Sequence, residues 1–107
     1  MKPEVTKLIL DIREAIADIR EFVGGMSLDE YLVDTKTRAA VERKFEVIGE
    51  ACARLRDRSP ETFQHIPSAQ EIIGFRNRLI HGYDQVDDAI VWDVISRKLP
   101  ELLGHLP

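Results

Sequence analysis

The stretch that decides this fold reads GFRNRLIHGY and runs from Gly74 to Tyr83. It brings two arginines, an asparagine, a histidine and a tyrosine together within ten residues, whereas few other stretches hold more than packing residues. Upstream of it, Ser68 and Glu71 have the spacing of a capping box, in which a serine hydroxyl and a glutamate carboxylate bond free backbone N–H groups at a helix start. We therefore predict a helix that begins near Ala69 and carries the stretch.

This predicted helix has an apolar face and a defined end. Its apolar residues recur at the spacings of an amphipathic helix and are Ile72, Ile73, Phe75, Leu79 and Ile80. Gly82 supplies the left-handed residue that ends many helices. We therefore expect His81 in the last turn of the helix and Tyr83 just beyond its end.

Arg76 and His81 are the candidate catalytic residues. An imidazole titrates near neutrality, so His81 could both take up and release a proton. Arg76 partly faces the core, where a guanidinium is tolerated only beside an anion such as phosphate or beside several acceptors. The two residues lie five positions apart, which is roughly 140° around an ideal helix. Either the break at Gly82 turns His81 toward Arg76, or a second copy of the helix completes the site.

The spacing of the polar residues matches a known signature. The stretch contains Arg76, then four residues, His81, one residue and Tyr83, with Asn77 directly after the arginine. This arrangement resembles the R-x4-H-x-Y pattern of the HEPN superfamily of helical nucleases. The longer segment 74–87 resembles the HepT-type toxin branch of that superfamily. Residues 45–51 and 91–103 are similar to what the family carries before and after its motif, so the resemblance covers nearly the whole chain.

The resemblance implies an activity, a partner and a set of roles. It implies a ribonuclease toxin that acts on RNA and is silenced by a nucleotidyltransferase antitoxin. Arg76 and His81 would be catalytic, and Asn77 and Tyr83 would support them. In the HepT branch the tyrosine, here Tyr83, would also be modified by the antitoxin through addition of AMP.

Each of these residues also has a plainer interpretation. His81 could be a helix-terminal histidine bonded to a carbonyl, and Tyr83 could be a packing aromatic. Asn77 could cap or cross-link helices, or it could orient Arg76. Glu50 could be an exposed helix residue, or it could support the site by pairing with one of the two arginines of the stretch.

Length and composition indicate a single HEPN-like domain over residues 1–107. The 107 residues, 44% hydrophobic and 32% charged, are enough for one core. The net charge of −4 argues against indiscriminate nucleic-acid binding. However, arginines gather at one predicted helix end and on the motif helix, which the preference of helix ends for bases would also explain. No signal peptide or spanning segment is recognisable, so we expect a cytoplasmic protein without a membrane partner.

The rest of the chain shows helical periodicity, without strand alternation, repeats or a linker. Residues 5–23 keep a helical period that Gly24-Gly25 ends. Ser27–Glu30 form a second capping box, which opens a short helix interrupted at Asp34. A third helix, marked by apolar residues from 41 to 55, should end at Ser59-Pro60, because a residue before proline resists helical geometry.

The remaining segments complete the architecture. A connector over residues 59–67 should insert Phe63 and Ile66 into the core and leave His65 at the surface. A last helix spans residues 86–103, opened by Asp84 and Asp87, with a kink or end of its regular part at Pro100. The economical fold is an all-α, up-and-down bundle of four to five helices.

Gly49 and Cys52 are two small residues inside the third predicted helix. Gly49 costs about 1 kcal/mol relative to alanine inside a helix, so we expect another helix, the one with the motif, to approach closely there. Cys52 is the only cysteine, lies on an apolar stripe and is expected to be buried rather than nucleophilic.

The residue set favours metal-free cleavage of RNA. The sequence shows no cluster of histidine and acidic residues at the spacing of metal ligands, no glycine loop that could hold a phosphate, and no serine or cysteine beside a base. We therefore expect no metal and no cofactor. When the 2′-hydroxyl of RNA attacks, the protein must only move protons and stabilise charge on the phosphate. The alternative is a non-catalytic helical module that binds a nucleotidyltransferase partner.

A homodimer would bring two copies of the motif helix around one cleft. It is favoured by apolar residues on more than one face of the motif and final helices, notably Phe75, Ile80, Trp92 and Ile95. A tightly wrapped monomer core could absorb these residues instead.

Overall fold

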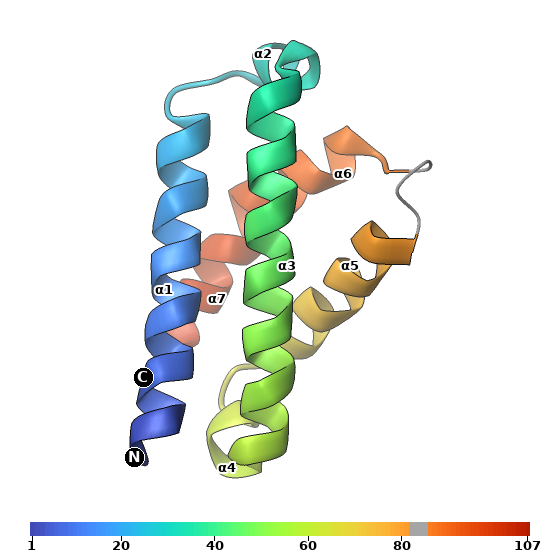
Figure 1. Ribbon diagram of the computed structural model, residues 1–107. Coiled ribbons are helices and arrows are strands. Elements are labelled where there is room, and N and C mark those ends of the chain that lie inside the picture. Colours follow the sequence, from blue (N-terminus) through green and yellow to red (C-terminus); the bar gives the residue numbers. More distant parts are fainter. Residues whose placement is uncertain (82–85) are drawn as a thin grey trace.

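The structure is a computed structural model of the chain, and it describes residues 1–81 and 86–107. Within these ranges every regular element is helical, which confirms the predicted all-α bundle. The long helices α1 (Pro3–Val23) and α3 (Thr35–Arg58) stand side by side. Helix α5 (Ala69–His81) crosses the other side of α3, and the C-terminal helical segment passes behind (Figure 1). None of the described helices is long and apolar enough to cross a membrane.

The first helix ends and the next two begin at the predicted residues. Gly24 has φ 49° and its N–H bonds the carbonyl of Arg20, so the glycine ends α1 in the left-handed region. Ser27 and Glu30 form the predicted capping box at the start of α2 (Leu28–Val33). Asp34 follows α2 and accepts the backbone N–H of Thr37 at 2.9 Å, so the interrupting residue is also the N-cap of α3.

The connector after α3 also follows the prediction. Helix α3 ends at Arg58, and the single turn α4 (Pro60–Phe63) follows. Ile66 is buried and Phe63 is half-buried against the core, while His65 is exposed. This short segment returns the chain to the beginning of α5.

The predicted capping box of α5 is wrong, although the helix does begin at Ala69. The hydroxyl of Ser68 is buried without a hydrogen-bond partner, and it is the Ser68 carbonyl that accepts the N–H of Ile72 at 3.1 Å. The carboxylate of Glu71 instead pairs with Nζ of Lys98 at 2.6 Å. A cation from the C-terminal helical segment therefore takes the carboxylate that the box requires.

The last predicted helix is present but changes its winding. It consists of α6 (Asp88–Asp93), a π-helical turn (Val94–Lys98) and α7 (Leu99–His105). The wide turn comes just before Pro100, which has no N–H and whose ring would collide with the carbonyl four residues earlier in an α-helix. The α-helix is therefore interrupted just before the proline and resumes in α7, so the predicted disturbance at Pro100 is present. Asp87 caps α6, while Asp84 lies outside the described residues.

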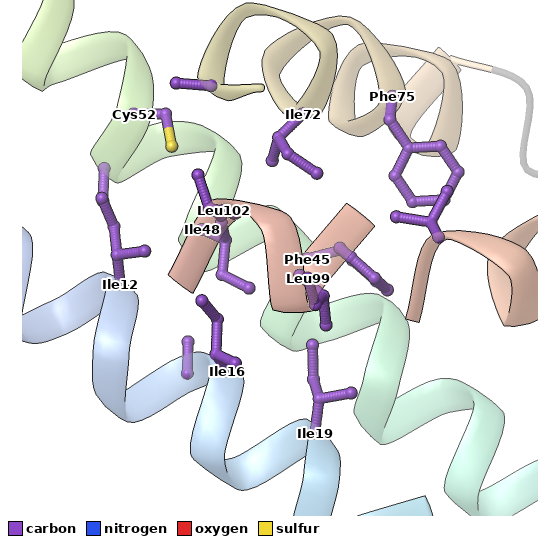
Figure 2. Close-up of a cluster of buried hydrophobic side chains, with 14 of the residues drawn as sticks. Ile12, Ile16, Ile19, Phe45, Ile48, Cys52, Ile72, Phe75, Leu99 and Leu102 are labelled. Carbon is purple, nitrogen blue, oxygen red and sulfur yellow. The ribbon is translucent and has the colours of Figure 1, made fainter. Parts of the chain in front are cut away.

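One hydrophobic core joins α1, α3, α5 and the C-terminal segment (Figure 2). The side chains of Ile12, Ile16 and Ile19 meet Phe45 and Ile48 from α3. Cys52 is fully buried among them, and burial raises the pKa of its thiol to about 12. The expectation of a buried cysteine is therefore confirmed.

Candidate active site

Arg76 is held where α5 crosses α3 at Gly49. A Cβ atom added at Gly49 would lie 2.4 Å from both Cβ and Cγ of Arg76 and 3.0 Å from its Cδ. Carbon atoms pack at about 3.5–4.0 Å, so the aliphatic stem of Arg76 occupies the space that any side chain at position 49 would need. The expectation that the motif helix approaches closely at Gly49 is confirmed.

The guanidinium of Arg76 is only partly bonded. Its Nη1 donates to Oδ1 of the neighbouring Asn77 at 3.2 Å. Its Nε is buried and lacks a hydrogen-bond partner, although buried N–H groups are nearly always bonded. None of the ion pairs within residues 1–81 and 86–107 includes Arg76. The side chain is therefore fixed at its stem and keeps donors for an anion at its tip.

His81 is exposed at the end of α5 and lines a hollow of about 380 Å³ between α5 and α6. Most of the lining is apolar and consists of Phe75, Leu79, Val86, Ile90 and Val91. Arg78 and Asp87 are the other polar members, and Arg76 is not among the lining residues. Tyr83, the fourth residue of the predicted set, lies outside the described residues.

Several contacts fix α6 as one wall of this hollow. Asp87 Oδ1 accepts two backbone N–H groups of the first turn of α6, at 3.0 and 3.4 Å. Arg38 Nε of α3 pairs with Oδ2 of Asp88 at 3.3 Å. The rings of Tyr31 and Trp92 pack with centroids 5.2 Å apart. Helices α2 and α3 thus hold α6 in place.

Two titratable side chains near Asp88, Glu42 and Tyr31, have pKa values above their ordinary ones. Burial, followed by the nearby carboxylate of Asp88, raises the pKa of Glu42. The same two causes, in the same order, raise the pKa of Tyr31, whose hydroxyl is buried without a hydrogen-bond partner. The Arg38 guanidinium partly offsets both shifts.

Glu50 does not pair with Arg76 or Arg78 as one interpretation of the sequence expected. Its exposed carboxylate lies 3.0 Å from Nη2 of Arg54, one turn further along α3. A partner four positions away on the same helix is always within reach, whereas a partner on α5 requires the two helices to present both side chains together. Glu50 therefore has only its local ion pair within the described residues.

The two groups of arginines differ in their partners. Arg54, Arg56 and Arg58 at the end of α3 pair with Glu50, Asp57 and Glu4, respectively. Arg76 and the exposed Arg78 on α5 take part in none of the ion pairs of the described residues. Apart from a possible pairing with Glu50, the one signal for Arg78 in the sequence is the clustering of positive charge on the motif helix.

Fold and site together define a class of protein. The described residues form a helical bundle, and its motif helix carries the R-x4-H spacing that resembles the HEPN superfamily. Residues 12–106 match the family described as "Ribonuclease HepT-like". The chain belongs to this HepT-like ribonuclease family.

Individual relatives agree with the family. The chain is 36% identical over 99 residues to "Putative RNase MJ0127" of Methanocaldococcus jannaschii, covering 92% of this chain and 81% of that protein. It is 35% identical over 104 residues to "Probable ribonuclease HepT" of Thermococcus cleftensis, covering 97% and 94%. The comparison with solved structures gives no match.

Proposed function

We propose that this protein is a metal-independent endoribonuclease that cleaves RNA through attack of the neighbouring 2′-hydroxyl. The observation that carries the proposal is the state of Arg76. Its stem is fixed against Gly49, its Nε–H is buried without a partner, and the ion pairs of the described residues do not include it. A guanidinium that is preorganised in this way, before the substrate binds, is suited to stabilise the negative charge that develops on a reacting phosphate.

His81 is the proposed proton carrier. Its imidazole is exposed at the end of α5, where a substrate can reach it. It would take the proton of the 2′-hydroxyl while that oxygen bonds to phosphorus, and the 5′-oxygen would leave with a proton returned by the imidazolium. The products would be a 2′,3′-cyclic phosphate end and a 5′-hydroxyl end. DNA lacks the 2′-hydroxyl, so this mechanism acts on RNA only.

Asn77 is the proposed positioning residue for the guanidinium tip. Its Oδ1 accepts from Nη1 of Arg76 at 3.2 Å, which supports the interpretation that Asn77 orients the arginine rather than capping a helix. Together, the glycine contact at the stem and the amide contact at the tip reduce the freedom that a long side chain loses on binding a phosphate.

The proposal includes a regulatory partner. By resemblance to the HepT branch, the protein would act in the cytoplasm as the toxin of a pair, and a nucleotidyltransferase antitoxin would silence it by adding AMP to Tyr83. Such a group adds negative charge and bulk only two positions after His81. It would compete with substrate phosphate for Arg76 and Arg78 of α5, which take part in none of the ion pairs within residues 1–81 and 86–107.

The proposal also includes a homodimer with a shared cleft. Arg76 and His81 are offset by roughly 140° on one helix, and Arg76 does not line the hollow that His81 lines. Both observations indicate that the two side chains lie apart in one copy. Of the apolar residues expected at the interface, Phe75 and Ile95 are buried in the core of the single chain, so they are not available for it. Ile80 and Trp92 are half-buried, so the exposed parts of these two side chains are what remains of the expected interface.

The second candidate is a non-catalytic module for the nucleotidyltransferase partner. It would use the same helix as a surface, and Arg76 and His81 would be structural. The unpartnered Nε–H of Arg76 argues against it, because a purely structural arginine at a helix crossing is expected to be fully bonded.

Cleavage of cellular RNA in EDTA tests the proposal. The wild-type protein should cleave and leave cyclic-phosphate or 3′-phosphate ends. His81→Ala and Arg76→Ala should each lose about 10²–10⁴-fold in rate with the fold intact. His105→Ala is the matched control, because His105 is also exposed and also the last residue of a helix. A requirement for Mg²⁺ would refute the mechanism, and undiminished cleavage by both site variants would refute the site.

A further inference from the structure

We propose that the hollow between α5 and α6 binds a nucleobase of the RNA, that of the nucleotide whose 2′-hydroxyl attacks. This inference rests on the proposed ribonuclease function, since His81, the proposed proton carrier, lines the same hollow. The walls of this hollow come from separate helices, so the sequence alone does not predict it.

The size and surface of the hollow suit a single base. Its volume of about 380 Å³ lies at the lower end of the roughly 300–1,000 Å³ typical of small-molecule sites. Three buried apolar residues, Phe75, Leu79 and Val91, supply much of its lining. Ile90 also lines it, and its side chain remains 52% exposed. The flat faces of a base are the part of a nucleotide that gains most from such surroundings.

The walls are held before any ligand arrives. The ring of Phe75 packs edge-to-face on Phe45 with centroids 5.0 Å apart and planes at 80°, and both rings lie in the core (Figure 2). The opposite wall, α6, is fixed by the ion pair between Arg38 and Asp88. A preformed site avoids the cost of ordering its own side chains on binding.

The polar side chains of the hollow match the rest of a nucleotide. Arg78 is exposed and outside the ion pairs of the described residues, so its guanidinium can donate to a phosphate or stack on a base. The carboxylate of Asp87 is held by its bonds to the first turn of α6 and can accept from base N–H groups. A cation, a fixed acceptor and the proposed proton carrier thus share one apolar hollow. This combination favours a nucleotide over a purely apolar occupant such as a helix of a second copy.

Binding of uncleavable nucleotides tests the inference directly. The probes are the four nucleoside 3′-monophosphates, compared with ribose 5-phosphate and inorganic phosphate, and the readout is the NMR shift of the Val86, Ile90 and Val91 methyl groups. At least one nucleotide should bind roughly tenfold tighter than ribose 5-phosphate, because only the nucleotide carries a base to contact the apolar lining. Equal affinities for nucleotide and ribose phosphate would overturn the proposal.

Two variants separate the base from the phosphate. Ile90→Ser should weaken nucleotide binding several-fold and leave phosphate binding unchanged, whereas Arg78→Gln should weaken both. Leu10→Ser is the matched control for Ile90→Ser, because Leu10 is 46% exposed on α1 and does not line the hollow. If Ile90→Ser instead converts a dimer to monomers without changing nucleotide affinity, the hollow is covered by a second copy and the proposal is wrong.

The same measurements distinguish failure of the inference from failure of the proposed function. Nucleotide binding in the hollow without any cleavage of RNA would leave the base site standing and remove the ribonuclease mechanism. Metal-free cleavage that Ile90→Ser leaves unchanged, with no methyl shifts on addition of nucleotides, would remove the base site and leave the ribonuclease mechanism standing.

Discussion

Gly49→Ala tests the contact that fixes Arg76. The new methyl group would lie 2.4 Å from Cβ and Cγ of Arg76, more than 1 Å inside the separation of about 3.5 Å at which carbon atoms begin to pack well. The Cγ atom can rotate away, but Cβ is bonded to the backbone of α5 and cannot. The two helices must therefore move apart, which perturbs the core that they share.

The expected loss of stability follows from two opposing terms. Overpacking of this kind typically costs about 1–3 kcal/mol, and replacement of a helical glycine by alanine returns up to about 1 kcal/mol. Because the clash includes an atom that cannot rotate, the upper half of the first range applies. We expect Gly49→Ala to be destabilised by about 1–2 kcal/mol, or roughly 4–15 °C in Tm for a domain of this size.

Thermal unfolding followed by circular dichroism measures this effect, with Gly74→Ala as the matched control. Gly74 is also inside a helix, but an added Cβ there meets nothing within 4 Å, so that variant should be as stable as the wild type or more stable. Adding Arg76→Gly to Gly49→Ala removes the clashing atoms and should recover part of the loss. The reasoning is wrong if Gly49→Ala raises Tm as much as Gly74→Ala does.

Three further predictions concern titration, the partner and the dimer. The pKa of Glu42 is raised in the folded protein above its ordinary value of 4.5, chiefly by burial, so its carboxyl favours folding at low pH and this contribution is lost as pH rises through that value and above it. The Tm of Glu42→Gln should therefore gain on the wild type as pH increases over that range, and a constant difference in Tm would contradict the assignment. Co-expression with the nucleotidyltransferase should add the mass of AMP to the wild-type chain, and Tyr83→Phe should abolish the addition; equal modification of both proteins would exclude this tyrosine. Mixing inactive Arg76→Ala and His81→Ala proteins should restore part of the cleavage if two copies share a cleft, whereas full activity of a 12.2 kDa monomer in light scattering would end the shared-cleft proposal.

The sequence by itself determined the helices of this protein, because the signals involved are local. Gly24 ends α1, Ser27 and Glu30 cap α2, and Asp34 caps α3, each through backbone groups no more than four residues away. Even the approach of α5 at Gly49 could be expected, because a helical glycine that costs stability requires a compensating contact. The family motif likewise lies within one short stretch and its spacing is read directly.

Only the tertiary structure decided which polar groups meet. The capping box predicted at Ser68 fails because Lys98, distant in sequence, takes the carboxylate of Glu71. In the opposite sense, Glu50 keeps its neighbour Arg54, and the expected pairing across helices does not form. In both cases the carboxylate pairs with the cation that lies nearest in space, and sequence separation does not predict which cation that is.

The hollow beside His81 belongs entirely to the tertiary structure. Its lining joins α5 to the segment 86–91, and α6 is held there by Arg38 and Tyr31 from α2–α3. Each of these residues has an ordinary local role as a core, cap or surface residue. A concave surface arises only from how separate helices pack, so periodicity along the chain can predict the helices but not the space between them.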